Sequence, residues 1–282
     1  MTLRKRHIIW VALLLVSSPT NTDKAWAGAW TQPKGKTWFR AGTMFQSTSE
    51  RYFIDGRRIP YFFEGHNRTV GFFFDFEHGV TEQLEVNAHL PFFGVTFNDL
   101  ADDRQSNGIG DVRVGARYNI LRGPFVATIG GRVKFPTGEF VNDAEIIPVG
   151  EGQYDFEVKG ELAHSFWPHP TYITGLIGYK FRTKNEENGI SYGDEIFWSA
   201  EGGYHVSSRI MLKAVFWGLY GLESTSFDLP LPSLTRQIAY LEPGILFELA
   251  PSRGIEISVP FTLWGQNWPA GPVVSVGFYQ RF

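Results

Sequence analysis

The chain contains no cysteine. Disulfide bridges, thiolate metal sites and lipid anchors on cysteine are therefore excluded. After Val16 the sequence also lacks the run of about 18 apolar residues that a transmembrane helix needs, so helical spans are excluded beyond that point. The formal net charge is only −3, and this absence of positive excess argues against nucleic acid as a partner.

The first residues have the pattern of a secretory signal peptide. The range Arg4–His7 is basic, Ile8–Val16 is a short apolar run, and Ala25–Ala27 is a small-x-small cleavage signature. We therefore expect residues 1–27 to be a signal peptide and residues 28–282 to form one exported domain.

Aromatic residues are abundant at 16%, yet the mean hydropathy is only −0.15. This combination is typical of strands in which apolar and polar residues alternate. In the range 84–90, for example, Leu84, Val86, Ala88 and Leu90 alternate with polar residues. The same pattern predicts twelve strands: 38–48, 68–77, 84–90, 111–120, 125–135, 154–162, 172–182, 195–204, 209–219, 237–249, 255–264 and 272–282.

Short turns and long polar segments alternate between these strands, the segments 49–67 and 98–110 being two of the long ones. Short periplasmic turns and long extracellular loops are typical of barrels in the outer membrane of Gram-negative bacteria. The sequence thus predicts an all-β fold, a transmembrane antiparallel β-barrel of about 12 strands. Pro243 and Pro260 leave the strand boundaries around them open, because each removes a backbone donor.

The chain ends on a strand whose last residue is Phe282. A terminal aromatic residue of this kind resembles the signal that the barrel-assembly machinery reads. A soluble β-sandwich is the alternative, but the charged second faces of the strands would leave it too little core.

Four segments resemble a known family: G-A-W-T-Q-P-K-G-K at Gly28–Lys36, G-I-G-D-V-R-V-G-A-R-Y at Gly108–Tyr118, V-K-F-P-T-G at Val133–Gly138 and G-E-G-Q-Y-D at Gly150–Asp155. They are similar to outer-membrane proteins of the meta-pathway phenol-degradation, transporter-like family. The resemblance implies a barrel in the outer membrane and passage of hydrophobic or aromatic compounds. It supplies no site residues.

Strand alternation places many charges on the inner face of the barrel. The main candidates for a solute path are Arg113, Arg117, Arg132, Lys134, Glu157, Glu161, Lys180, Glu195 and Glu201. These charges are interpreted either as a pore lining that selects solutes or as an internal salt-bridge network that fills the barrel.

Four aromatic residues also have inward parity: Phe73, Phe197, Trp217 and Tyr240. They are interpreted either as a path for hydrophobic solutes or as contacts for an inward-folded loop, for which Ser49–Asn67 is long and aromatic enough.

The favoured function is a passive channel for small solutes, hydrophobic or aromatic ones among them, with outer-membrane lipids as surroundings. The alternative is a structural or loop-mediated binding barrel with a filled lumen. An outer-membrane lipid hydrolase is less favoured, because no outward Ser and His lie on adjacent strands at the extracellular rim. No enzyme activity, cofactor or metal is expected; Asp99, Asp102 and Asp103 are interpreted as a solvated loop.

Overall fold

The computed structural model describes residues 28–140 and 147–282. The expected signal peptide, residues 1–27, lies outside the described residues. Within the described ranges no helix is long and apolar enough to cross a membrane.

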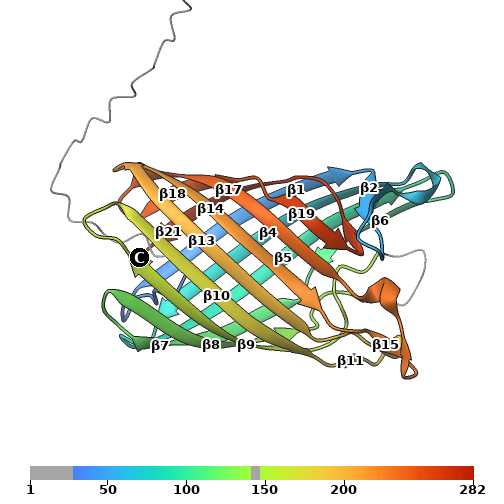
Figure 1. Ribbon diagram of the computed structural model, residues 1–282, viewed down its shortest axis with the longest axis horizontal. Coiled ribbons are helices and arrows are strands. Elements are labelled where there is room, and N and C mark those ends of the chain that lie inside the picture. The colour runs from blue at the N-terminus through green and yellow to red at the C-terminus, as the bar shows by residue number, and fades with distance from the viewer. Residues whose placement is uncertain (1–27, 141–146) are drawn as a thin grey trace, which may run out of the picture.

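Fourteen strands form one antiparallel sheet that closes on itself (Figure 1). They are β1 (Thr37–Thr48), β4 (His66–Gly79), β5 (Leu84–Asn98), β6 (Asp103–Ile109), β7 (Val112–Leu121), β8 (Phe125–Phe135), β9 (Asp155–Ser165), β10 (Thr171–Arg182), β13 (Glu195–Ser207), β14 (Ile210–Gly221), β17 (Gln237–Ala250), β18 (Arg253–Ser258), β19 (Phe261–Gln266) and β21 (Val273–Arg281). Because β6 continues into β7 and β18 into β19, the wall is a closed barrel of twelve strands, as predicted.

The last strand closes the barrel onto the first. Strand β21 pairs with β1 from Arg281 opposite Trp38 to Val273 opposite Gln46. The backbone N–H of Phe282 also donates to the carbonyl oxygen of Thr37 at 2.9 Å. Closure pairs the first strand with the last, which matters because an unpaired backbone group in hydrocarbon costs several kcal/mol.

The wall has an apolar outside and a polar inside. Outward side chains such as Phe72, Ile129 and Ile177 are 54%, 52% and 65% exposed, whereas the charged Glu85 and Glu195 are fully buried. A soluble protein would bury the first set and expose the second. This inverted distribution is that of a barrel whose outer surface faces lipid.

The predicted loop 98–110 is largely wrong. Residues Asp103–Ile109 form β6, which pairs with the C-terminal half of β5, from Phe92 to Asn98. The sequence hides this strand because it carries only polar residues and glycine before Ile109, so the apolar alternation that marks a membrane-facing strand is missing.

The two prolines have different effects. Pro243 lies inside β17, opposite Ala214 of β14. Pro260 separates β18 from β19. Strand β18 pairs with both β17 and β21, whereas β19 pairs only with β17 in the described sheet. Pro269 and Pro272 stand in the returning segment, where their missing N–H groups prevent a ladder with β19.

Two small sheets lie at the long-loop end of the barrel. One joins β2 (Glu50–Tyr52), β3 (Arg58–Pro60) and β20 (Trp268–Pro269). The other joins β11 (Lys184–Asn185), β12 (Ile190–Ser191), β15 (Thr225–Ser226) and β16 (Leu229–Pro230), and two 3₁₀ turns (η1, Phe62–Glu64; η2, Pro232–Leu234) complete the loops. In the segment Ser49–Asn67, the residues Phe62 and Phe63 are more than 60% exposed, so these aromatic side chains do not fill the lumen.

Candidate functional site

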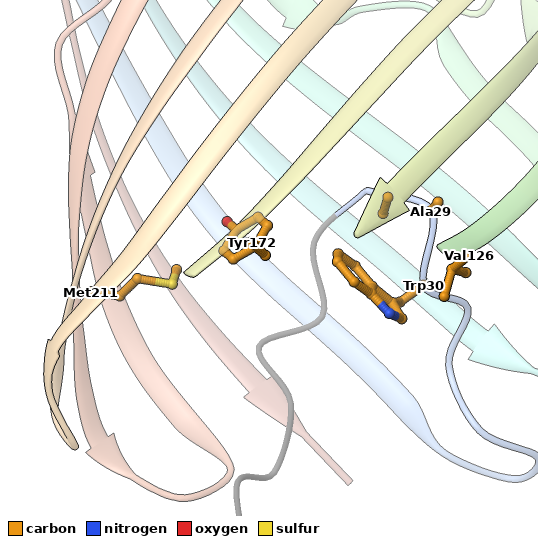
Figure 2. Close-up of a cluster of buried hydrophobic side chains, with 6 residues drawn as sticks. Ala29, Trp30, Val126, Tyr172 and Met211 are labelled. Carbon is orange, nitrogen blue, oxygen red and sulfur yellow. The ribbon is translucent and has the colours of Figure 1, made fainter. Parts of the chain in front are cut away.

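The segment Gly28–Lys36 precedes β1, and its first part, Gly28–Gln32, lies inside the barrel near the short turns, whereas Lys34 to Lys36 are exposed. Ala29 is fully buried and Trp30 is only 9% exposed. Figure 2 shows Trp30 in the lumen beside Val126 of β8, with Tyr172 of β10 facing it. The Trp30 and Tyr172 rings meet edge to face, with their centroids 5.9 Å apart. The N-terminal segment therefore narrows this end of the lumen.

Hydrogen bonds from the wall hold the backbone of this segment. Arg117 Nη1 donates to the Gly28 carbonyl oxygen at 2.8 Å, and Thr128 Oγ1 donates to that of Ala29 at 2.5 Å. The N–H of Gln32 donates to Glu85 Oε2 at 2.7 Å. Gly28 has a φ of +70°, and a Cβ there would overlap the side chain of Thr174, so only glycine fits.

One arginine organises the charges around this segment. The Arg117 guanidinium lies 2.6 Å from Glu85, 3.2 Å from Glu161 and 3.5 Å from Glu77. Lys159 contributes a second cation, 2.5 Å from Glu161. These five side chains, which we call the turn-end cluster, tie β4, β5, β7 and β9 together.

A second group of charges lies at the long-loop end. Its centre is Glu151, from the segment between β8 and β9, which pairs with Lys134, with Arg182 at 3.2 Å and with Arg236 at 2.7 Å. Burial alone would raise the pKa of Glu151, but Arg236, Arg182 and Lys134 hold this pKa well below its ordinary value. Glu151 is therefore held as a carboxylate at neutral pH.

A buried glutamate on β13 extends this group. Glu195 lies 2.5 Å from Arg236, 2.7 Å from Lys180 and 3.3 Å from Arg182. Burial and the two carboxylates Glu151 and Glu195 act on Arg236 in opposite directions, and the net effect raises the pKa of Arg236 above its ordinary value. The chain of contacts continues through Glu157, which lies 3.7 Å from Lys180 and 2.6 Å from Arg132.

Three of the segments that carry the family resemblance meet in this group. Asp111 lies 3.0 Å and Asp155 3.1 Å from the Lys134 ammonium, which is 1% exposed. Asp111 also accepts hydrogen bonds from the backbone N–H groups of Gly138 and Glu151. We call the whole set the loop-end cluster: Asp111, Arg132, Lys134, Glu151, Asp155, Glu157, Lys180, Arg182, Glu195 and Arg236.

The structure thus brings most of the sequence-derived charge candidates together as ion pairs. Glu201 belongs to neither cluster; it accepts a hydrogen bond from Tyr172 at 2.5 Å and lies 3.8 Å from Lys213. Arg113 takes part in none of the ion pairs found among the described residues.

The inward aromatic residues lie against the wall. The ring of Phe73 covers Gly71 and that of Phe197 covers Gly178, each at the place where a Cβ would otherwise stand. Trp217 and Tyr240 stack with centroids 4.6 Å apart, and Trp217 Nε1 donates to Glu242 at 3.0 Å. Missing glycine side chains therefore make room for large rings inside the barrel.

Sequence reasoning missed the inserted segment Gly28–Lys36. Its residues entered only as a resemblance motif, because the range shows no alternation. Pro33 with Gly35 was the available signal, since this pair argues against an extension of the first strand and for a turn into it.

Outside the lumen, two shallow hollows lie on the outer wall, where Ala116, Gly131, Gly160 and Gly175 stand between larger side chains. They face away from both charge clusters.

The aspartates of the 99–103 segment stabilise their own loop, because Asp99 Oδ1 accepts hydrogen bonds from the N–H groups of Ala101 and Asp102. Among the residues that the structure describes, no group of three His, Cys, Asp or Glu could hold a metal ion.

A closed antiparallel barrel with an apolar wall and a charged lumen is a β-barrel of the outer-membrane type. The chain belongs to the family described as "Putative MetA-pathway of phenol degradation", whose model matches residues 61–278. No curated protein matches the sequence.

A solved structure has a similar fold. The COG4313 outer membrane channel from Pseudomonas putida F1 is similar over 89% of this chain and 97% of that chain, with a TM-score of 0.77 and 13% identity. The CymD monoaromatic hydrocarbon channel is more distant, with a TM-score of 0.49, 11% identity and 89% coverage of each chain. The toluene transporter TbuX of Ralstonia pickettii has a TM-score of 0.46 and 9% identity, covering 89% of this chain and 90% of its own.

Proposed function

We propose that this protein is a passive channel of the bacterial outer membrane for small solutes, hydrophobic or aromatic ones among them. One observation carries the proposal. Phe73, Phe197 and Trp217 face inward, away from the outer surface, yet each stays partly exposed to solvent. Solvent therefore reaches these rings inside the barrel. Aromatic side chains along a solvent-filled lumen suit planar apolar solutes.

The resemblance and the comparisons support the same proposal. The family is described by a phenol-degradation pathway, and a solved structure of similar fold is an outer-membrane channel. In the proposed orientation the short turns, the N-terminal segment and Phe282 face the periplasm, and the long loops face outward. Export through a cleaved signal peptide at 1–27 and insertion by the barrel-assembly machinery belong to the proposal.

Ion conductance of the purified protein in planar lipid bilayers tests the channel. Stepwise conductance that benzene-like solutes reduce is the expected result. A silent membrane, with folding confirmed by heat-modifiable migration on a gel, would contradict it.

The second candidate is a barrel with a filled lumen whose function resides in its loops. The two ion clusters favour it, because they occupy both ends of the lumen. A silent membrane would support this candidate.

A further inference from the structure

Arg113 is an unpaired cation in a lumen where other cations are paired. Nine other lumen-facing arginine and lysine side chains on the wall strands lie within ion-pair distance of a carboxylate: Arg40, Arg104, Arg117, Arg132, Lys134, Lys159, Lys180, Arg182 and Lys213. Within residues 28–140 and 147–282, Arg113 has no such partner. Arg281 has none either, but its guanidinium lies over the ring of Tyr279 at the short-turn rim.

The strand register explains why Arg113 lacks a partner. It stands directly opposite His89 of β5 and Lys134 of β8, and Arg132 lies two residues before Lys134 on β8. No carboxylate occupies these positions. The charges of Lys134 and Arg132 are balanced within the loop-end cluster.

Glu157, Glu151 and Asp155 also act on Arg113, but from beyond ion-pair distance, and each of them lies closer to another cation. The acidic residues near Arg113 in sequence and strand register are engaged as well. Asp111, two residues before Arg113, serves Lys134 and two backbone N–H groups. Asp75, across β5, lies 2.6 Å from His89 and 3.4 Å from Arg40. A guanidinium with no carboxylate within ion-pair distance, in a confined and partly desolvated lumen, favours an anion from solution.

An aromatic surface begins at His89, the residue that stands opposite Arg113 in the strand register. The His89 imidazole stacks on the Phe73 ring, with centroids 5.6 Å apart and 21° between planes. Phe73 meets Phe93 edge to face at 5.8 Å, and Phe93 is held against Gly110. Phe73 and Phe93 remain partly exposed, so a planar ring can reach them from the lumen.

We propose that Arg113, His89, Phe73 and Phe93 form a binding site for a small aromatic carboxylate. The guanidinium fork receives the carboxylate through two parallel hydrogen bonds, and the ligand ring packs on Phe73 and Phe93. Arg113 lies level with Asp75, two strands away, and Phe73 is two residues further along β4, so the Cα atoms of Arg113 and Phe73 are about 12 Å apart at the usual strand spacing and rise. One benzene ring with its carboxyl group and the long arginine side chain can bridge this distance. The site rests on the proposed function and names its substrate class.

Calorimetry on the purified protein in detergent tests the site with three probes: benzoate, its uncharged analogue benzamide, and cyclohexanecarboxylate, which keeps the charge without the aromatic ring. We expect benzoate to bind about tenfold more tightly than either other probe, as a charge-assisted pair and a ring contact predict. Equal binding of benzoate and benzamide would overturn the proposal.

Three variants separate the contributions of the residues. Arg113→Gln abolishes the preference for benzoate over benzamide, and Phe73→Leu abolishes the preference over cyclohexanecarboxylate. Lys213→Gln, at a paired lumen cation, is the matched control and preserves both preferences. Because Arg113 has no ion-pair partner, its replacement strands no carboxylate, and heat-modifiable migration verifies folding. Unchanged preferences in Arg113→Gln would refute the site.

Bilayer conductance measured in parallel distinguishes the two proposals. Conductance without any benzoate preference leaves the channel standing and removes the site. Benzoate binding by a protein that conducts no ions leaves the site standing and removes the channel.

Discussion

The two ends of the lumen are narrowed by different means. Near the short turns, a stretch of main chain lies inside the barrel, and Arg117 and Thr128 bind its carbonyl oxygens. Near the long loops, ion pairs between side chains dominate, with Glu151 and Glu195 as centres. The lumen is narrowed near the short turns by an inserted segment, and near the long loops by charged side chains.

This difference has a physical consequence. Ion pairs that solvent reaches weaken when salt screens them, whereas apolar packing and hydrogen bonds to backbone carbonyls respond little to salt. The turn end should therefore change when residues that anchor the segment are replaced. The loop end should respond to salt at the pair that solvent reaches, Glu151 with Arg236, and to the charge of Glu151.

Replacing Arg117 should have the largest effect, because its buried guanidinium serves both the ion cluster and the inserted segment. Its side chain is 8% exposed and lies within 3.5 Å of three carboxylates. Arg117→Gln leaves these charges uncompensated, which costs about 3–5 kcal/mol for a buried pair. Urea-induced unfolding in detergent should show this loss of unfolding free energy.

Arg132→Gln is the control for the loop end. The Arg132 side chain is 31% exposed and pairs with Glu157. Solvent reaches the arginine, and the buried Glu157 keeps Lys180 at 3.7 Å as a second cation, so a loss smaller than that of Arg117→Gln, about 1–2 kcal/mol, is expected. Equal losses in the two variants would show that Arg117 has no special position.

Trp30→Ala should have a smaller effect on global stability and a clear effect on conductance. Trp30 packs against Tyr172 in the buried cluster of the turn end, and truncation of a buried tryptophan removes about 3–5 kcal/mol of packing. The remaining hydrogen bonds contribute about 1 kcal/mol each, so the segment should leave the lumen while the barrel stays folded.

Single-channel conductance measures this release directly and should rise in Trp30→Ala. Trp167→Ala, at a turn residue that is 71% exposed, is the matched control and should leave conductance unchanged. A conductance that stays the same in Trp30→Ala would mean that the inserted segment does not limit the channel.

The wall could be predicted from the sequence because lipid imposes a simple pattern on it. Every second residue must be apolar, so Val276 and Phe278 reveal the orientation of β21 without further information. The same reasoning placed the inward residues, including Phe73 and Trp217. Beyond the apolar band the alternation of apolar and polar residues ends, so the sequence predicts a loop where β6 lies.

The lumen could not be predicted in the same way. Parity assigns Lys134 and Glu195 to the inside, but some of their partners, such as Glu151 and Arg236, come from loops whose positions follow from packing. The inserted segment follows from single contacts, such as the Gly28 carbonyl on Arg117. No periodic signal encodes such contacts.

Replacing Glu151 should show itself mainly in ion selectivity. Glu151→Gln removes the carboxylate that faces Lys134, Arg182 and Arg236, so the loop end becomes more positive. Reversal potentials in a KCl gradient should shift towards anions at about 0.1 M salt and much less at about 1 M, where the Debye length falls to about 3 Å. Glu186→Gln, at an exposed position near β11, is the control and should cause no shift.

The pH dependence of ion selectivity in the unaltered protein also tests the role of the Glu151 carboxylate. The folded pKa of Glu151 lies well below the ordinary value of 4.5, so its contribution to stability is fully present above pH 4.5 and is lost as the pH falls towards the lowered value. Selectivity governed by this carboxylate should thus be constant from pH 7 to pH 5 and shift towards anions only in more acidic solution. A shift between pH 7 and pH 5 that Glu151→Gln removes would show that the three cations do not hold Glu151 ionised, and that the loop end is closed by packing as the turn end is.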